Sequence, residues 1–428
     1  MGSGENLDDT EVAIGTEPGA IAINAVSEDE PAYGWVVCMS MHCINGFTWG
    51  IIASYGIYLS YYISNNTFEG ASDLGFTFVG GANFATAMAC TPLVNLCIRK
   101  FGTNIPMYFG AVCFAGGFIA ASFATEFWHL VLSQGIMVGI GTGFIWMPAT
   151  PLLPQWFRRN RSLAQGISAG GSGVGGIIWS FSTVPMIDNL GLGWALRITG
   201  MCALVVLLTA SYLVRDRNEI IRPRIKPLDV QLLKRRQVWM LMGFTAFSML
   251  GYIVLTFTLS SFALSLGLSQ DQAGVITGML NLGTLLGRPF IGVLSDHFGR
   301  LTIASLFTFL NAVFTFAIWI PTNSYGLLIF LAIIVGPTAG VFWATITPIS
   351  AEVVDLKDLP STLAIMWLTV MLPALFSTAI GLELRMPESS RPYLAPQIYA
   401  GLAYIIATLF LLEVKRHKMG LWARERHR

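Results

Sequence analysis

One arginine lies inside an otherwise apolar helix, and its position indicates chemistry. Arg288 stands in the stretch LLGRPFIGVLSDHFGR, which has no other charge before Asp296. Asp296 and Arg300 indicate the water-facing end of a membrane helix, so Arg288 lies about 12 Å inside, at about 1.5 Å per residue. A cation near the middle of a bilayer normally faces a protein interior or a watery cavity and has a function. We expect Arg288 to bind an anionic group of a substrate, the alternative being a structural bond to carbonyls at a helix end.

Composition places the whole chain in a membrane. Of its 428 residues, 54% are hydrophobic and only 11% are charged, compared with about 25% charged residues in soluble domains. Its net charge is only +1, and the basic residues follow the loops and form no patch, so we expect no nucleic-acid partner. The six cysteines have neither metal-ligand nor disulfide spacing, and no ATP motif is present. We therefore expect no metal, no cofactor and no enzymatic activity.

Apolar runs of spanning length recur along the chain and predict an all-α membrane protein with twelve transmembrane helices. Before them, residues 1–32 are acidic and hold no Lys or Arg, which predicts a disordered cytosolic tail and no cleaved leader. The predicted spans are 34–61, 72–98, 105–125, 128–153, 161–188, 194–214, 238–266, 271–295, 301–320, 325–352, 360–384 and 393–414.

Basic residues test this topology, because they accumulate on the cytosolic side of membrane proteins. Of the 25 basic residues, 21 lie in loops and at chain ends that the predicted spans place on the same side of the membrane. The four exceptions are Arg197, Arg288, Arg385 and Arg391. Both termini are therefore predicted to be cytosolic, in a multi-pass protein of the plasma membrane that contacts the lipid bilayer.

An internal repeat divides the chain into halves. At an offset of 197 residues, two separate patches match: Pro92, Phe101 and Gly102 fall on Pro289, Phe298 and Gly299, and Gly143, Trp146, Thr150 and Pro151 fall on Gly340, Trp343, Thr347 and Pro348. Repeated six-helix units are the organisation of major facilitator transporters. The predicted parts are a six-helix bundle at 33–214, a basic cytosolic linker at 215–237, a second six-helix bundle at 238–414 and a basic cytosolic tail at 415–428.

Three segments carry a resemblance to a known family. They are YGWVV from Tyr33, WFRRNRSLAQGISAGGSGVGG from Trp156, and Gly287-Arg288-Pro289. In these the chain resembles the major facilitator superfamily and, within it, the fungal branch of the monocarboxylate transporter-like family. The resemblance implies that Arg288 binds the substrate carboxylate. Two residues depart from the family pattern: Thr284 replaces an acid one turn before that arginine, and Ala53 falls where a lysine is usual.

The same resemblance implies the residues that line the path, because the superfamily's helices 1, 4, 7 and 10 surround it. Here those helices carry His42, Asn45, Trp146, Tyr252 and Trp343, and no Asp, Glu or Lys joins them. We expect the last four to contact substrate, a shared packing role being the alternative for the two tryptophans. His42 is a candidate for proton coupling, because histidine changes charge near physiological pH, or else a hydrogen-bonded packing residue.

Two further motifs lie near the ends of helices. Asp296, Gly299 and Arg300 resemble the superfamily's cytosolic loop motif and are predicted to take part in gating, the alternative being a solvated turn. Asn65 begins the sequon Asn65-Asn66-Thr67 in a predicted outside loop and is a candidate glycosylation site. Within the membrane, small residues are predicted to let helices approach closely; they are Gly166, Ser168, Gly170, Ser172 and Gly176.

These observations predict a secondary active transporter, a symporter or antiporter that works by alternating access. The favoured substrate is a small monocarboxylate or related organic acid, with a proton as the possible coupling ion. The alternatives are efflux of a fungal secondary metabolite, uptake of a vitamin-like compound, and a non-transporting membrane receptor.

Overall fold

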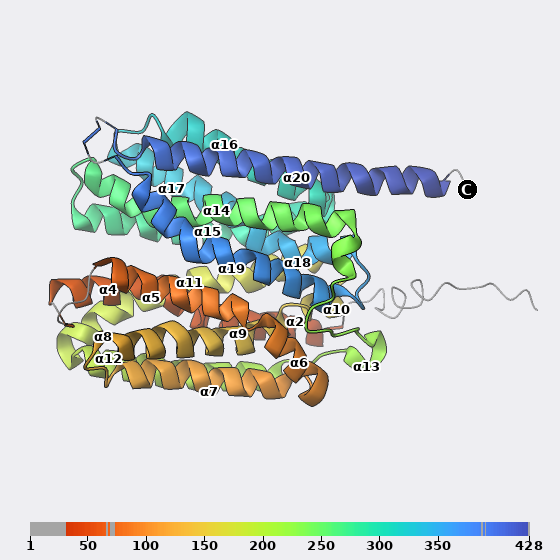
Figure 1. The fold of residues 1–428 in the computed structure, drawn as a ribbon, viewed down its shortest axis with the longest axis horizontal. Helices are drawn as coiled ribbons and strands as arrows, with labels where there is room; N and C mark the ends of the chain where they lie inside the picture. The colour runs from red at the N-terminus through yellow and green to blue at the C-terminus, as the bar shows by residue number, and fades with distance from the viewer. Residues whose placement is uncertain (1–30, 66, 69–72, 387, 390, 427–428) are drawn as a thin grey trace, which may run out of the picture.

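The computed structural model describes residues 31–65, 67–68, 73–386, 388–389 and 391–426. Within these ranges all regular structure is helical, which confirms the predicted all-α class (Figure 1). The predicted acidic tail lies outside the described residues, apart from Pro31 and Ala32.

The first part of the chain forms one group of helices, drawn in red to yellow-green in Figure 1. Its elements are α2 (Tyr33–Phe47), α3 (Trp49–Ala53), α4 (Tyr55–Ser64), α5 (Asp73–Ala89), α6 (Thr91–Phe101), α7 (Asn104–Ala121), α8 (Phe127–Leu130), η1 (Val131–Met137), α9 (Val138–Ala149), α10 (Leu153–Trp156), α11 (Arg161–Leu190) and α12 (Leu192–Leu213).

A linker with two short helices leads to the second group, drawn in green to blue beside the first. The linker contains α13 (Asn218–Ile221) and η2 (Leu232–Lys234). The second group consists of α14 (Arg236–Ser265), α15 (Gln270–Phe298), α16 (Arg300–Phe314), η3 (Thr315–Trp319), α17 (Tyr325–Ala339), α18 (Val341–Val353), α19 (Leu359–Glu383) and α20 (Leu394–Arg426).

The helices are long enough to cross a membrane. Among the described residues nine are both long and apolar enough, and a pair bent by 43° between α5 and α6 makes ten. The helices α11 and α15, of 30 and 29 residues, are equally long but richer in glycine and polar residues. They are less apolar because they pack against each other inside the molecule. With these two, the structure is consistent with the predicted twelve.

Three predicted spans differ in detail from the observed helices. The first is broken at Thr48 and Ser54, and the second bends at Cys90, just before Pro92. The last continues from 414 to Arg426, because a run of lysine and arginine favours helix even after the apolar pattern ends. Pro289 does not break α15, which continues on both sides of it.

The internal repeat is visible in the geometry of two helix ends. Gly102 after α6 and Gly299 after α15 have positive φ angles of 78° and 95°. Glycine adopts this conformation without the steric penalty that other residues meet, so it ends both helices at equivalent positions. The sequence offset therefore reproduces the same turn in both halves.

The two ends of the bundle differ in charge. We call one the basic end: it holds α10, α13 and the C-terminal end of α20, at the right of Figure 1. Its basic residues include Arg99, Lys100, Arg158, Arg159, Arg161, Arg215, Arg300 and Lys418. The other end, with α4 and α8, we call the opposite end.

Glycine lets α11 contact both α2 and α15 closely. A Cβ built on Gly166 would lie 2.4 Å from the Arg288 carbonyl oxygen, and one on Gly171 would lie 2.0 Å from that of His42. No side chain fits at such separations, so the backbones themselves are in contact. The predicted role of small residues in close helix packing is confirmed at Gly166.

Candidate functional site

Arg288 lies at the seam between the two groups of helices. It is only 5% exposed, and its Nη1 donates to the Ala169 carbonyl oxygen at 2.7 Å and to the Ser172 hydroxyl at 2.8 Å. Both partners belong to α11. The arginine therefore bonds to the other half of the molecule, although the carbonyl is in the body of a helix and not at a helix end.

The guanidinium of Arg288 has a hydrogen-bond donor without a partner. Its Nε is buried without a hydrogen-bond partner, and no carboxylate among the described residues forms an ion pair with it. Thr284 leaves no acid one turn earlier, and its hydroxyl donates instead to the Gly336 carbonyl on α17 at 3.1 Å. Arg288 is therefore a buried cation with donor capacity to spare.

Space for this guanidinium comes from a glycine. A Cβ at Gly340 would lie 2.7 Å from Nη2 of Arg288 and 3.0 Å from Nε. Gly340 lies between α17 and α18, where the helix is interrupted. Tyr252 on α14 interacts with the guanidinium through its hydroxyl. Residues from α11, α14 and the α17–α18 junction thus surround the arginine on α15.

Next to this site, four tryptophans from both halves of the molecule pack together. We call them the tryptophan cluster: Trp49 on α3, Trp146 on α9, Trp343 on α18 and Trp367 on α19. Ring centroids of Trp49 and Trp343 are 5.9 Å apart, and those of Trp146 and Trp367 are 4.8 Å apart. Trp343 also stacks on Trp367 with an angle of 13° between the ring planes. Tyr252, at 6.3 Å from Trp343, joins the cluster to Arg288.

The structure brings together four of the predicted substrate residues. Two of them, Asn45 and Trp146, are bonded to each other, and the other two, Tyr252 and Trp343, are not. Trp146 donates from Nε1 to the Asn45 Oδ1 at 3.0 Å, and Asn45 donates to the Ser168 hydroxyl at 3.1 Å. Their polar groups satisfy one another, which is typical of packing. Tyr252 instead lies between Arg288 and Trp343, the member of the cluster whose ring is 6.3 Å from it.

His42 lies on α2 against α11, with its Nδ1 2.7 Å from the Ile167 carbonyl oxygen. The ring is half-buried. A ring nitrogen this close to a carbonyl must carry the proton, which fixes the tautomer of a neutral His42. The role of His42 in proton coupling stays a prediction.

The predicted gating motif joins the two halves at the basic end. Asp296 at the end of α15 accepts from the backbone N–H groups of Ser162 at 3.0 Å and Leu163 at 2.8 Å, in the first turn of α11. Arg300 pairs with Asp296 at 3.3 Å and with Glu352 at 3.1 Å. A carboxylate at a helix N-terminus satisfies unpaired donors and the positive end of the helix dipole. Gly299 supplies the turn that places Arg300 beside it.

The linker also connects the halves at this end. Asn95 on α6 donates to the Lys226 carbonyl at 3.0 Å. On the other side, the Lys226 N–H donates to the Ser361 hydroxyl at 3.1 Å, and that hydroxyl donates to the Arg224 carbonyl at 2.9 Å. Residues 224–226 thus bridge α6 and α19.

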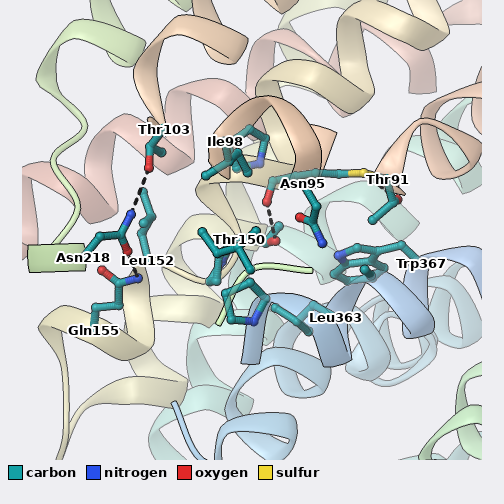
Figure 2. A pocket seen from close by; sticks show the side chains of 16 residues that line it. Thr91, Asn95, Ile98, Thr103, Thr150, Leu152, Gln155, Asn218, Leu363 and Trp367 are labelled. Atoms are coloured by element: carbon teal, nitrogen blue, oxygen red, sulfur yellow. Dashed lines mark hydrogen bonds between the residues drawn. The ribbon is translucent and has the colours of Figure 1, made fainter. Parts of the chain in front are cut away.

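A small pocket opens beside this bridge (Figure 2). Trp367 forms part of its wall, so one tryptophan of the cluster borders the pocket at the basic end. The polar side chains around Thr103 already bond to one another, with Gln155 donating to Asn218 and Asn218 to Thr103. Arg288 and the other three tryptophans of the cluster are not among the residues that line the pocket.

The remaining predicted sites are simpler. Asn65 is exposed just after α4, at the opposite end, and its amide donates to the Tyr61 carbonyl at 3.0 Å. Across the described ranges, no group of three or more His, Cys, Asp or Glu side chains is arranged to hold a metal ion.

Sequence reasoning missed Trp49, Trp367 and Ser172. Trp49 follows Asn45 by four residues, and this spacing places both on one helix face, so the signal was present. Trp367 lies on a helix outside the expected lining set and has no repeat mate at the offset of 197 residues. Only tertiary packing places it in the cluster.

Comparison with known proteins gives a consistent picture. The family model described as Major Facilitator Superfamily matches residues 38–269 and 245–421. "Probable transporter MCH2" of Saccharomyces cerevisiae is 33% identical over 391 residues, covering 90% of this chain and 83% of the relative. "Uncharacterized transporter ESBP6" of the same yeast is 31% identical over 410 residues, 92% of this chain but only 60% of the relative. "Fujikurins efflux protein" of Gibberella fujikuroi is 26% identical, covering 91% and 85%.

Solved structures share the fold. The proton:xylose symporter XylE matches with a TM-score of 0.70 at 15% identity, over 90% of this chain and 96% of that chain. FucP in the outward conformation matches with a TM-score of 0.68 at 12% identity, over 89% and 99%. At these identities the likeness concerns the fold alone.

Proposed function

This chain belongs to the Major Facilitator Superfamily and is a multi-pass membrane transporter, not an enzyme; we propose that it carries a small monocarboxylate or related organic acid by alternating access. The monocarboxylate transporter-like segments of the sequence motivate this choice of substrate. One observation carries it: Arg288 is a buried cation between the two halves with no carboxylate partner among the described residues.

A charge at this depth is costly, by at least about 2.5–3.5 kcal/mol on insertion scales. Two hydrogen bonds to α11 offset part of that cost. An anionic substrate group offsets more, because a guanidinium and a carboxylate form two parallel hydrogen bonds in a fork that lysine does not reproduce. The unused Nε of Arg288 is one of the donors available for such a pair.

In this proposal the moving units are residues 33–214 and 238–414, which rock about the α11–α15 seam. The Asp296 contacts with α11 and the linker bridge hold the basic end closed. Substrate then meets Arg288 from the opposite end, and the basic end opens when these contacts break. Asp296, Gly299 and Arg300 act as the gate.

The basic end faces the cytosol in this proposal, because basic residues are retained on that side. Both termini are then cytosolic, in the plasma membrane, and Asn65 is outside the cell. His42 carries the coupling proton, since it is a half-buried histidine on α2 against the helix that bonds Arg288.

The test is transport of a panel of radiolabelled carboxylates in cells that lack this gene. Arg288→Lys should insert normally and raise the apparent KM for an acidic substrate, and Arg288→Ala should abolish its transport. Arg197→Lys is the matched control, because Arg197 lies at the opposite end, stacked over the Phe123 and Trp194 rings. If both Arg288 variants moved the substrate like wild type, the arginine would be structural and the proposal would be wrong.

A second candidate is efflux of a larger fungal metabolite. The similarity to the fujikurins efflux protein favours it, as does the aromatic surface beside Arg288. Uptake of a vitamin-like compound would use the same surface. Export of an uncharged compound that does not depend on Arg288 would favour efflux over the organic-acid proposal.

A further inference from the structure

Two indole N–H groups of the tryptophan cluster have no acceptor. Nε1 of Trp49 and Nε1 of Trp367 are buried without hydrogen-bond partners, whereas Nε1 of Trp146 is bonded to Asn45. The Nε of Arg288, next to the cluster, is also unpartnered. Three orphan donors, contributed by both halves of the molecule, therefore lie around Tyr252 and Trp343.

The chemistry of these groups restricts what fits them. An indole N–H and a guanidinium donate hydrogen bonds and accept none. A buried donor without an acceptor is unfavourable, so a ligand that supplies acceptors is stabilised there. A carboxylate is the acceptor that forms the strongest bond with Arg288, and neutral acceptors on another part of the same ligand suit the two indoles.

The surroundings of the donors favour a flat ligand. Trp343 and Trp367 are nearly parallel, and Trp49 lies 5.9 Å from the Trp343 ring. Aromatic rings pack favourably in offset-stacked or edge-to-face arrangements with such indoles. Phe84 extends the same surface at 4.8 Å from Trp49.

A carboxylate that could bind an ammonium group is not paired with the arginine of this site. No Asp or Glu of the described residues forms an ion pair with Arg288, and Oε1 of Gln165 is a buried neutral acceptor without a partner. The amide nitrogen of Gln165 is 3.5 Å from the Trp343 carbonyl oxygen, which places that acceptor beside the cluster. Burying an ammonium without a carboxylate is unfavourable, so we expect the ligand to carry no ammonium group.

Building on the organic-acid function proposed above, we propose that the substrate is a planar aromatic carboxylic acid with a second hydrogen-bond acceptor on its ring and no ammonium group. Its carboxylate binds Arg288, and its ring lies against Tyr252 and Trp343. The ring acceptor takes the N–H of Trp49 or Trp367. Trp49 and Trp367 thereby determine which acids are preferred.

Binding to the purified full-length protein in lipid nanodiscs tests this, measured as the ligand-dependent rise in unfolding temperature. The probes are benzoate, nicotinate, cyclohexanecarboxylate, pyruvate, phenylalanine and benzamide. Benzoate should bind more tightly than cyclohexanecarboxylate and pyruvate, and phenylalanine should not bind. Nicotinate, with its ring nitrogen as acceptor, should bind about two- to tenfold more tightly than benzoate, the range of one added hydrogen bond.

Variants separate the donors from the rings. Trp49→Phe and Trp367→Phe each keep an aromatic ring and remove one N–H, so in at least one of them the nicotinate preference should fall to parity while benzoate still binds. Trp319→Phe is the matched control, because Trp319 also has a buried, unpartnered indole N–H but lies outside the cluster, beside Phe262. The Trp319→Phe variant should still bind nicotinate more tightly than benzoate.

The outcomes distinguish the two proposals. Equal binding of benzoate and cyclohexanecarboxylate, or an unchanged nicotinate preference in both variants, would overturn the aromatic inference and leave the organic-acid function standing. Tightest binding of pyruvate would do the same. Binding of benzamide as tight as that of benzoate would instead overturn the organic-acid function itself, as would the absence of saturable binding by every acid.

Discussion

Replacing Asp296 should open the basic end. Its carboxylate accepts from two backbone N–H groups of α11 at 3.0 and 2.8 Å and lies 3.3 Å from Arg300. The two N–H groups belong to the other half of the molecule, so they lose this acceptor whenever the basic end opens. The contacts therefore stabilise the closed conformation relative to the open one.

The free energy that the Asp296 contacts contribute to the closed conformation can be estimated from the geometry. Removing a capping side chain costs about 0.5–2 kcal/mol, and a partly buried charge at a helix end contributes up to about 2 kcal/mol. The Arg300 pair adds at most about 1 kcal/mol, because Arg300 keeps Glu352 as a partner. Asp296→Ala should thus lose about 1–3 kcal/mol, which shifts the closed-to-open ratio by about 5- to 150-fold. Asp296→Asn keeps one acceptor oxygen and should lie near the lower limit.

The assay is a distance measurement between spin labels on cysteines at Arg99 and His297, in a background where the six native cysteines are replaced. Both positions are exposed and belong to different halves. The open population should increase in the order wild type, Asp296→Asn, Asp296→Ala. Transport should slow in the same order at normal expression, because the return to the closed state becomes less favourable.

Asp355→Asn provides the control, since Asp355 is an acid at the same end whose side chain, among the residues that the structure describes, accepts only from Lys357 in its own loop. It should leave the distance distribution unchanged. Equal distributions for wild type and Asp296→Ala would refute the gating role and reduce the motif to a turn.

Three further predictions concern other parts of the molecule. Glycosidase treatment should shift the wild-type band but not that of Asn65→Gln, and a shift that persists in the variant would contradict the topology. Gly175→Ala should destabilise the protein by about 1–3 kcal/mol, because its Cβ would lie 2.1 Å from the Gly46 carbonyl oxygen. Gly176→Ala is the control and should not destabilise it, because the nearest contact of its Cβ would be at 3.6 Å. Equal melting temperatures of the two variants would refute this prediction. Asn95→Ala removes the linker bond to Lys226 and should raise the open population about two- to tenfold; no change in the spin-label distances would show that the linker does not hold the basic end.

Several features could be predicted from the chain because they depend on the sequence along one dimension. Span length follows from bilayer thickness, so apolar run lengths predicted the helical class and the approximate spans. The offset of 197 residues matched Phe-Gly at 101–102 with Phe-Gly at 298–299, and in the structure both glycines end a helix with a positive φ. Breaks within helices were not predicted, because Thr48 and Ser54 carry no strong helix-breaking signal.

The site itself was predicted only in part. Arg288 was identified because a charge in an apolar run is conspicuous in any sequence. Its partners, Ala169 and Ser172, lie more than 100 positions away in the chain. No periodicity relates them to Arg288, since contacts between helices depend on how the helices pack.

The sequence by itself thus determined the membrane class, the repeat and the position of the buried cation, because hydrocarbon thickness and backbone sterics act on each segment separately. The tertiary structure decided that Trp49, Trp343 and Trp367 meet beside Arg288 and that Asp296 caps a helix of the other half. Those contacts exist only where α11 and α15 approach closely enough for backbones to touch, which glycines such as Gly166 permit. Which polar groups then find partners, and which have none, follows from that packing alone.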